Sequence, residues 1–438
     1  LACNLDIGGF GGWLFIRVLR GEIIMGSLLA PFSALRPSLE YAQAVVAPPY
    51  DVISRDEARE LSIGQPWSFL HISRPEIDLP SDGDFSSTEI YRKGSKYLQK
   101  MLDAGVLVRD KRPSFYIYRI ESDGKSQTGF VGAGSVEAYE KNLIRRHELT
   151  RPDKEKDRVD QILSVNAHTG PVLAVHSSNQ PLNTISQCFC DENSPEYSVE
   201  HQGATHSLWS IHKPELVQKI MTEFNNLGVI YIADGHHRSA AASRVAKIKR
   251  DANPRHNGRE PYNRFLVVSF PETEVRILDY NRVVKGFNNL SQGDFLAALE
   301  NNFRVSVSSS PVRPTRSLSF GLYLHGKWYE INYLGDIKGY SSETDILDVN
   351  ILQNSILSPI LKIGDPRIDP RIGFVGGTRG LSELERLVDS GSWSVAFSLF
   401  PTSMNQLMAV ANESKIMPPK STWFEPKLAD GLVSLALD

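Results

Sequence analysis

The hydrophobic pattern along the chain alternates between strand-like and helix-like segments, without a regular repeat. Short apolar runs rich in β-branched and aromatic residues predict strands over 115–120, 128–133, 229–233, 265–270 and 275–278. Apolar residues at helical spacing predict helices over 55–61, 88–104, 239–250 and 294–301. Asp-Gly and His-Gly pairs predict hairpin turns at 123–124 and 325–326. The pattern therefore predicts an α+β fold of mixed, mostly antiparallel sheets with helices.

Two further segments complete the expected organisation. Residues 69–74 alternate in the manner of a strand, and the polar stretch 179–205 is expected to be a loop. We expect residues 25–438 to form a single unit, in which 179–205 is a weak boundary between two lobes.

The first 24 residues differ from the rest of the sequence. The chain begins with Leu1, and the apolar run 10–19 contains Arg17 and is too short to span a membrane. No small-residue cleavage site follows a charged segment, so a signal peptide is not indicated. Met25 is a plausible true start, and we expect residues 1–24 to be a disordered, non-native extension.

Composition narrows the class of protein. The 438 residues are 41% hydrophobic and 23% charged, as in ordinary globular proteins, and the net charge of −3 gives no reason to expect nucleic acid as a partner. Three cysteines at positions 3, 188 and 190 form neither a disulfide framework nor a paired metal motif. We therefore expect a cytoplasmic protein without a membrane partner, and the sequence leaves its oligomeric state open.

The most informative stretch is Asp-Gly-His-His-Arg at 234–238, between the predicted strand 229–233 and the predicted helix from Ser239. The positive end of a helix dipole disfavours further positive charge, so His236, His237 and Arg238 are best explained if an anion binds there or the histidines stay neutral. Helix N-termini are ready-made phosphate sites. The stretch therefore predicts an anion site, most readily one for phosphate.

Two other interpretations of this turn stay open. Asp234 would be an ordinary helix cap, Gly235 would supply a positive φ, and the basic residues would be solvated. A metal site is less well supported, because adjacent histidines on a helix diverge by about 100°, whereas helical zinc ligands are spaced at i and i+4.

A second dense stretch covers residues 145–158. Thr150 and Asp153 are predicted to cap a helix whose first turn contains Pro152. His147 and Glu148 then lie on the loop that enters the helix, where catalytic groups are often held. The alternative is a charged, solvated helix face; the mixed signs disfavour nucleic-acid binding.

Near the C-terminus, Lys420, Ser421 and Thr422 resemble the end of a phosphate-binding loop. The preceding residues are two prolines and not a glycine-rich cradle, so a Walker A motif is rejected. A lysine and two hydroxyls held by rigid turns are still candidates for phosphate contact, and an ordinary turn is equally consistent.

Several of these stretches together resemble a known family. The sequences at 30–37, 47–52, 146–151, 233–238, 374–377 and 418–424 are similar, in order, to the bacterial and archaeal family called domain of unknown function 1015. The similarity extends from Leu28 to the C-terminus, and residues before Met25 are not part of the family pattern. The family name implies no activity.

A more distant likeness concerns the 234–238 turn alone. It is similar to the motif of free-serine kinases of the ParB/sulfiredoxin-like superfamily, which phosphorylate L-serine using a nucleotide and Mg²⁺. The resemblance implies a ParB/sulfiredoxin-like core, with Asp234, His236, His237 and Arg238 around the transferred phosphoryl group. It also implies ATP or ADP as cosubstrate. The family's glutamate base has no motif match here, and we assign that role to Glu148 from its position beside His147.

Three functions follow as hypotheses. The first is a kinase-like phosphotransferase acting on a small hydroxylated metabolite, with Glu148, His147, His237 and Asp234 as catalytic residues and Asp234 as a Mg²⁺ ligand. Its phosphate-binding residues would be Gly235, His236, Arg238, Arg151, Lys420, Ser421 and Thr422. With water as the acceptor, the same site would be a phosphatase for a phosphometabolite such as phosphoserine.

The second hypothesis is a non-catalytic, nucleotide-sensing regulator that uses the same pocket. The third is metal-dependent hydrolysis with His147, Glu148, His236 and His237 as the metal site.

Overall fold

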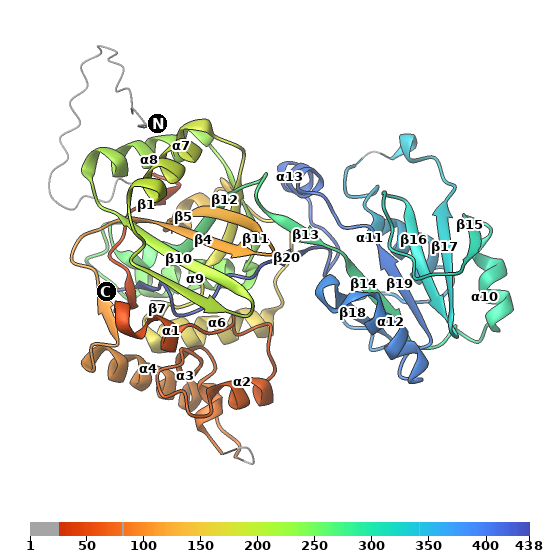
Figure 1. The fold of residues 1–438 in the computed structure, drawn as a ribbon, viewed down its shortest axis with the longest axis horizontal. Helices are drawn as coiled ribbons and strands as arrows, with labels where there is room; N and C mark the ends of the chain where they lie inside the picture. Colours follow the sequence, from red (N-terminus) through yellow and green to blue (C-terminus); the bar gives the residue numbers. More distant parts are fainter. Residues whose placement is uncertain (1–25, 81–82, 341) are drawn as a thin grey trace, which may run out of the picture. The chain divides into compact units, whose positions relative to one another are not determined.

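The computed structural model describes residues 26–80, 83–340 and 342–438 (Figure 1). The expected extension at 1–24 lies outside the described residues. The chain divides into two compact units. The first comprises the described residues up to Arg145, residues 150–274 and 426–438, and the second comprises 146–149 and 275–425. The expected boundary at 179–205 lies inside the first unit, and the chain passes to the second unit after Glu274.

The first unit is built on a nine-stranded sheet of order β6-β11-β8-β12-β5-β4-β10-β9, with β1 paired to β5. Its strands are β1 (Leu29–Ala30), β4 (Phe115–Ser122), β5 (Lys125–Ser135), β6 (Ile144–Arg145), β8 (Val172–His176), β9 (Tyr197–His201), β10 (Ala204–Ile211), β11 (Ile230–Asp234) and β12 (Arg264–Pro271). Two short pairs accompany the sheet: β2 (Leu35–Pro37) with β3 (Leu107–Arg109), and β7 (Ala167–His168) with β21 (Leu435–Ala436).

The helices of the first unit pack on this sheet or in a smaller core of their own. They are α1 (Ala42–Val45), α2 (Arg55–Ser62), α3 (Leu70–Ser73), α4 (Ser87–Asp103), α5 (Val136–Glu140), α6 (Pro152–Val165), α7 (Gln180–Glu192), α8 (Pro214–Leu227) and α9 (His236–Asp251). Figure 1 shows α7 and α8 next to each other beside the sheet. Their apolar faces, with Leu182 of α7 and Phe224 of α8, join the same core as Phe130 of β5. Helices α6 and α9 pack against each other, and several residues of the candidate site lie on them.

The second unit has a fully antiparallel six-stranded sheet of order β15-β17-β16-β19-β14-β18. These strands are β14 (Tyr280–Val284), β15 (Phe303–Ser308), β16 (Ser319–Leu324), β17 (Lys327–Tyr333), β18 (Ile372–Gly376) and β19 (Val395–Leu399). A separate ribbon pairs β13 (Arg276–Leu278) with β20 (Trp423–Glu425). The helices are α10 (Gln292–Leu299), α11 (Asp348–Leu352), α12 (Gly380–Asp389) and α13 (Met404–Asn412). Leu384 and Val388 of α12 pack on the sheet at Ala396.

The fold class is α+β, as the sequence predicts, with mostly antiparallel sheets in both units. Parallel pairing occurs only at β6–β11 and β8–β12 within the described residues. The ParB/sulfiredoxin-like core stays a prediction. Among the helices of the described residues, none is long and apolar enough to cross a membrane.

Two local predictions are wrong. Residues 70–73 form the short helix α3 and not a strand, and 179–205 is not a loop, because it contains α7, β9 and the start of β10. The signal for α7 was present in the sequence. The side chain of Asn179 caps this helix by accepting the Leu182 N–H at 2.9 Å, and a proline occupies its first turn.

Candidate functional site

The 234–238 stretch joins β11 to α9, as predicted, but the helix begins at His236, three residues before the predicted Ser239. Strand β11 ends at Asp234, and α9 begins at His236 after a left-handed Gly235 with φ of 96°. A Cβ at Gly235 would lie 3.2 Å from the Cα of Val172 on the neighbouring strand β8, so a side chain there would be both strained and crowded. The first intrahelical bond runs from Ser239 N–H to the Gly235 carbonyl at 3.0 Å, which leaves the amides of 236–238 ahead of it.

Asp234 is an ionised group at the centre of this turn and not the helix cap. Its Oδ1 accepts the Gly235 N–H at 2.8 Å, and its Oδ2 lies 3.1 Å from Nζ of Lys427. Burial raises the pKa of Asp234, but the positive charges of Lys427 and Arg238 outweigh this effect and hold the pKa below its usual value. Lys427 therefore belongs to the site.

Arg238 is held by protein groups from two other segments. Its Nη1 donates to the Pro171 carbonyl at 2.7 Å, and its Nη2 lies 3.1 Å from both carboxylate oxygens of Asp51. Only 11% of the Arg238 side chain is exposed. Each terminal nitrogen carries a second N–H group, so the direct binding of phosphate by Arg238 stays a prediction.

Tyr50, which precedes Asp51, places its aromatic ring beside two arginine side chains. The guanidinium of Arg158 lies 3.8 Å from the centre of the Tyr50 ring, and that of Arg238 lies 5.2 Å from it. Burial, with a further contribution from Asp51, raises the pKa of Tyr50 to about 12, so its hydroxyl stays protonated at neutral pH. Arg158 is buried and pairs with Asp157 at 2.6 Å, so this part of the charged segment 145–158 is not a solvated helix face.

His237 contacts the entrance of α6. Its Nε2 accepts the backbone N–H of Arg151 at 3.1 Å. A nitrogen that accepts a hydrogen bond carries no proton, so Nε2 of His237 is unprotonated in this contact. The predicted Thr150–Asp153 cap is wrong: Arg151 is the N-cap residue without a side-chain bond, and Thr150 donates to Glu155 at 2.7 Å.

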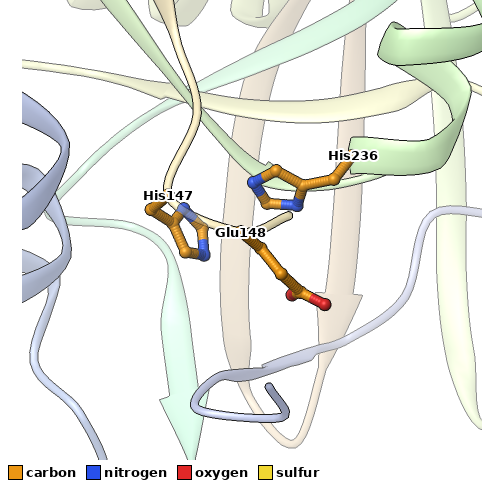
Figure 2. A group of neighbouring side chains, drawn as sticks. All are labelled: His147, Glu148 and His236. Carbon is orange, nitrogen blue, oxygen red and sulfur yellow. The ribbon is translucent and has the colours of Figure 1, made fainter. Parts of the chain in front are cut away.

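His147 and Glu148 lie on the short segment 146–149, which belongs to the second unit and connects Arg145 and Thr150 of the first unit. His147 is buried and Glu148 is half-buried. Figure 2 shows these two side chains with His236, and one potential ligand atom from each lies within 4.8 Å of the others. The structure thus brings together three of the residues that the sequence singled out.

The phosphate-loop-like residues 420–422 belong to the second unit. Ser421 is buried, and its hydroxyl donates to the Pro418 carbonyl at 2.7 Å, so it closes its own turn. Lys420 is exposed and has a positive φ of 58°. Their role in phosphate binding stays a prediction.

Sequence reasoning missed two charged residues beside the turn: Lys427, which pairs with Asp234, and Asp430, whose charge acts on Arg238. Asp430 is 1% exposed and lies in an otherwise apolar C-terminal run, from Leu428 to Val433. An acidic residue inside such a run was the available signal, because carboxylates are seldom fully buried without a specific reason.

Comparison with known proteins identifies the family. The model of the family "Protein of unknown function (DUF1015)" matches residues 29–352. The chain belongs to this family. None of the curated proteins compared with the sequence is a significant match.

Several solved structures are distantly similar to this DUF1015 protein. A free serine kinase in complex with AMP has 12% identity and a TM-score of 0.35, over 67% of this chain and 86% of the other. A conserved hypothetical protein from Pyrococcus furiosus has 12% identity and a TM-score of 0.34, over 68% and 93%. SbnI from Staphylococcus aureus, truncated at its C-terminus, has 12% identity and a TM-score of 0.34, over 67% and 82%.

Proposed function

We propose that this DUF1015 protein transfers a phosphoryl group between a nucleotide and a small hydroxylated metabolite. The observation that carries the proposal is the turn at 234–238. A helix begins there directly after a buried strand, at a glycine that cannot cap it with a side chain, and Lys427 and the Arg151 backbone lie beside it. The positive end of the helix dipole and these groups favour an oxyanion at this place.

The proposed roles follow from the contacts. The helix N-terminus binds the transferred phosphoryl group, with His237 in the first turn of the helix beside it. Arg238, fixed by Asp51 and Pro171, stabilises the loop that borders the site and adds positive charge beside the phosphoryl group. Glu148, three residues before Arg151, accepts the proton of the attacking hydroxyl, with His147 beside it.

Mg²⁺ does not fit Asp234 as a direct ligand. One carboxylate oxygen of Asp234 accepts the Gly235 N–H and the other pairs with Lys427, so both are engaged by the protein. We derive no step through a metal ion on this residue. ATP or ADP stays the proposed cosubstrate.

The test is a nucleotide-turnover screen with free amino acids and their phosphates. Wild type is compared with Glu148→Gln and His237→Ala. The matched controls His212→Ala and Glu215→Gln make the same two changes at exposed positions in the first unit. Loss of a general base costs about 10²–10⁴-fold in turnover, so we expect Glu148→Gln to fall in this range. Turnover that both site variants retain would remove these residues from the mechanism.

The same screen separates the alternatives. Release of inorganic phosphate from phosphoserine without a nucleotide would indicate a phosphatase. Tight nucleotide binding without turnover of any substrate would indicate a sensor. A stoichiometric transition metal in the purified protein, measured by elemental analysis, would favour metal-dependent hydrolysis, which the grouping of His147, Glu148 and His236 allows.

A further inference from the structure

A cavity of about 270 Å³ lies in the first unit, at the end of α9 remote from the 234–238 turn. Its walls come from α5, the last turn of α9, the connection that follows α9 and the first residue of β12. Arg250, in that last turn, is fourteen residues beyond His236, which corresponds to about 21 Å along a helix. Pockets for drug-sized ligands measure roughly 300–1,000 Å³, so this cavity suits a small metabolite at a place separate from the proposed oxyanion site.

The cavity is lined by charged side chains of both signs. Glu137 and Glu140 lie one turn apart on α5, whereas Arg250 ends α9 and Arg264 begins β12. A simple anion bound to the arginines would be repelled by the carboxylates, and a simple cation bound to the carboxylates would be repelled by the arginines. The lining therefore favours a ligand that carries a positive and a negative charge together.

Glu140 and Arg250 form a loose and accessible pair in this lining. Oε1 of Glu140 lies 3.8 Å from Nη2 of Arg250, which is longer than the roughly 2.7–2.9 Å of a charge-assisted hydrogen bond. The Glu140 side chain is 41% exposed and that of Arg250 is 37% exposed, so a ligand can reach both. Glu137, in contrast, pairs closely with Lys141 at 2.5 Å. Glu140 is therefore the carboxylate better placed to bind a ligand cation.

Arg264 adds a positive charge that is only 6% exposed. Its Nη1 donates to the Ser27 carbonyl at 2.8 Å and its Nη2 donates to the Ser27 hydroxyl at 3.2 Å, and these two acceptors are uncharged. Burial lowers the pKa of Arg264 to about 10, against an opposite effect of the Glu137 charge. A further negative charge in the cavity would therefore be stabilised by this guanidinium.

We propose that this cavity binds a free α-amino acid, whose carboxylate contacts Arg250 and Arg264 and whose ammonium group contacts Glu140. A single carbon atom separates the two charged groups of an amino acid, which matches the close approach of opposite charges at Glu140 and Arg250. The inference goes beyond the proposed function and does not depend on it, because binding here requires neither a nucleotide nor turnover.

The test is calorimetric titration of the full chain, without nucleotide, with each of the common L-amino acids. Any amino acid that binds is compared with its α-amide, which lacks the carboxylate, and with its des-amino analogue, which lacks the ammonium group. Glu140→Gln and Arg250→Gln each remove one charge from the lining. The matched controls Glu215→Gln and Lys247→Gln remove the same charges at exposed positions outside it.

We expect at least one amino acid to bind with a Kd below about 1 mM. Its amide and its des-amino analogue should bind at least about tenfold more weakly, because each lacks a charge-assisted hydrogen bond. Glu140→Gln and Arg250→Gln should weaken binding of the amino acid by at least about tenfold, and the two controls should change it by about twofold or less. His237→Ala, at the other end of α9, should also leave this binding unchanged.

Wild type that binds none of the amino acids would overturn the proposal. Binding that Glu140→Gln and Arg250→Gln both retain would overturn it as well, and so would an amide that binds as tightly as its amino acid. Binding lost in His237→Ala but kept in the two cavity variants would place the amino acid at the 234–238 turn, against the proposal. Failure of the proposed function gives a different result: nucleotide turnover is absent, while amino-acid binding and its loss in the cavity variants are still observed.

Discussion

The buried acid Asp430 makes the stability of the first unit depend on pH in an unusual direction. Most carboxylates in folded proteins are stabilised in their ionised form, so acid destabilises the fold. Asp430 is the opposite case, because burial raises its pKa from the ordinary 3.8 to about 7. Between these two values the native state holds a proton that the unfolded chain has lost. The free energy of unfolding must therefore fall as the pH rises through this window, and the contribution is constant above it.

The size of the effect follows from the shift. Each pKa unit corresponds to 1.36 kcal/mol, so a shift of about three units gives an upper limit of about 4 kcal/mol. About two thirds of this, roughly 2–3 kcal/mol, falls between pH 5 and pH 8. Asp430→Asn keeps the shape of the side chain and cannot ionise. The difference in unfolding free energy, variant minus wild type, should therefore increase by roughly this amount from pH 5 to pH 8.

The assay is urea unfolding of wild type and Asp430→Asn at half-unit steps from pH 5 to pH 8. Asp191→Asn, which removes an exposed carboxylate of the first unit, is the control and should follow the wild-type pH dependence closely. Parallel pH dependences for wild type and Asp430→Asn would refute the reasoning, because they would show that the carboxyl ionises equally well in the folded and unfolded chains.

Two further predictions concern the turn and its arginine. Gly235→Ala should lower the free energy of unfolding by about 1–3 kcal/mol, because φ is 96° and the new Cβ would crowd Val172. Gly203→Ala is the control, since Gly203 also has a positive φ but has open space around it, and it should lower the free energy of unfolding by about 1 kcal/mol. Urea unfolding measures both variants, and equal losses would contradict the crowding argument. Arg238→Leu should lower the free energy of unfolding by about 3–5 kcal/mol, because it leaves buried acceptors without their partner. Asp51→Asn should lower it by about 1 kcal/mol or less, because Asp51 is 39% exposed. The reverse order in thermal unfolding would show that Arg238 does not organise the site.

Local signals account for what the sequence predicted correctly. The hairpin of β4 and β5 turns at Asp123 and Gly124, both at positive φ, and the helix α2 begins with the capping box of Ser54 and Glu57. Each of these features depends on residues close together in the chain. The same is true of the turn from β11 to α9, where the change from a β-branched run to an alanine-rich run marks the boundary.

The failures also have local causes. Residues 69–74 alternate weakly between apolar and polar, which predicted a strand. In the structure the polar and apolar residues from Phe69 to Ser73 are all buried at a small core, so the alternation does not separate a buried face from an exposed one. Residues 179–205 are mostly polar, so the amphipathic helix α7 was not recognised in the sequence. Its buried residues are Leu182, Ile185, Ser186 and Cys188.

The site itself was predictable only in part. The turn at 234–238 could be recognised from the residues around it, but the partners of Arg238 and Asp234 lie far away in the sequence. Asp51 is 187 residues from Arg238, and Lys427 is 193 residues from Asp234. A single sequence gives no information on such pairs, so it could not show that Arg238 is already paired or that Asp430 faces it.

The central claim is that an oxyanion binds at the N-terminus of α9, and a crystal structure of the protein with ADP tests it most directly. The account predicts a phosphate oxygen within about 3 Å of a backbone nitrogen among residues 236–238, with Arg238 still bound to Asp51. A nucleotide whose phosphates lie elsewhere, or crystals that contain no nucleotide at millimolar ADP, would contradict it.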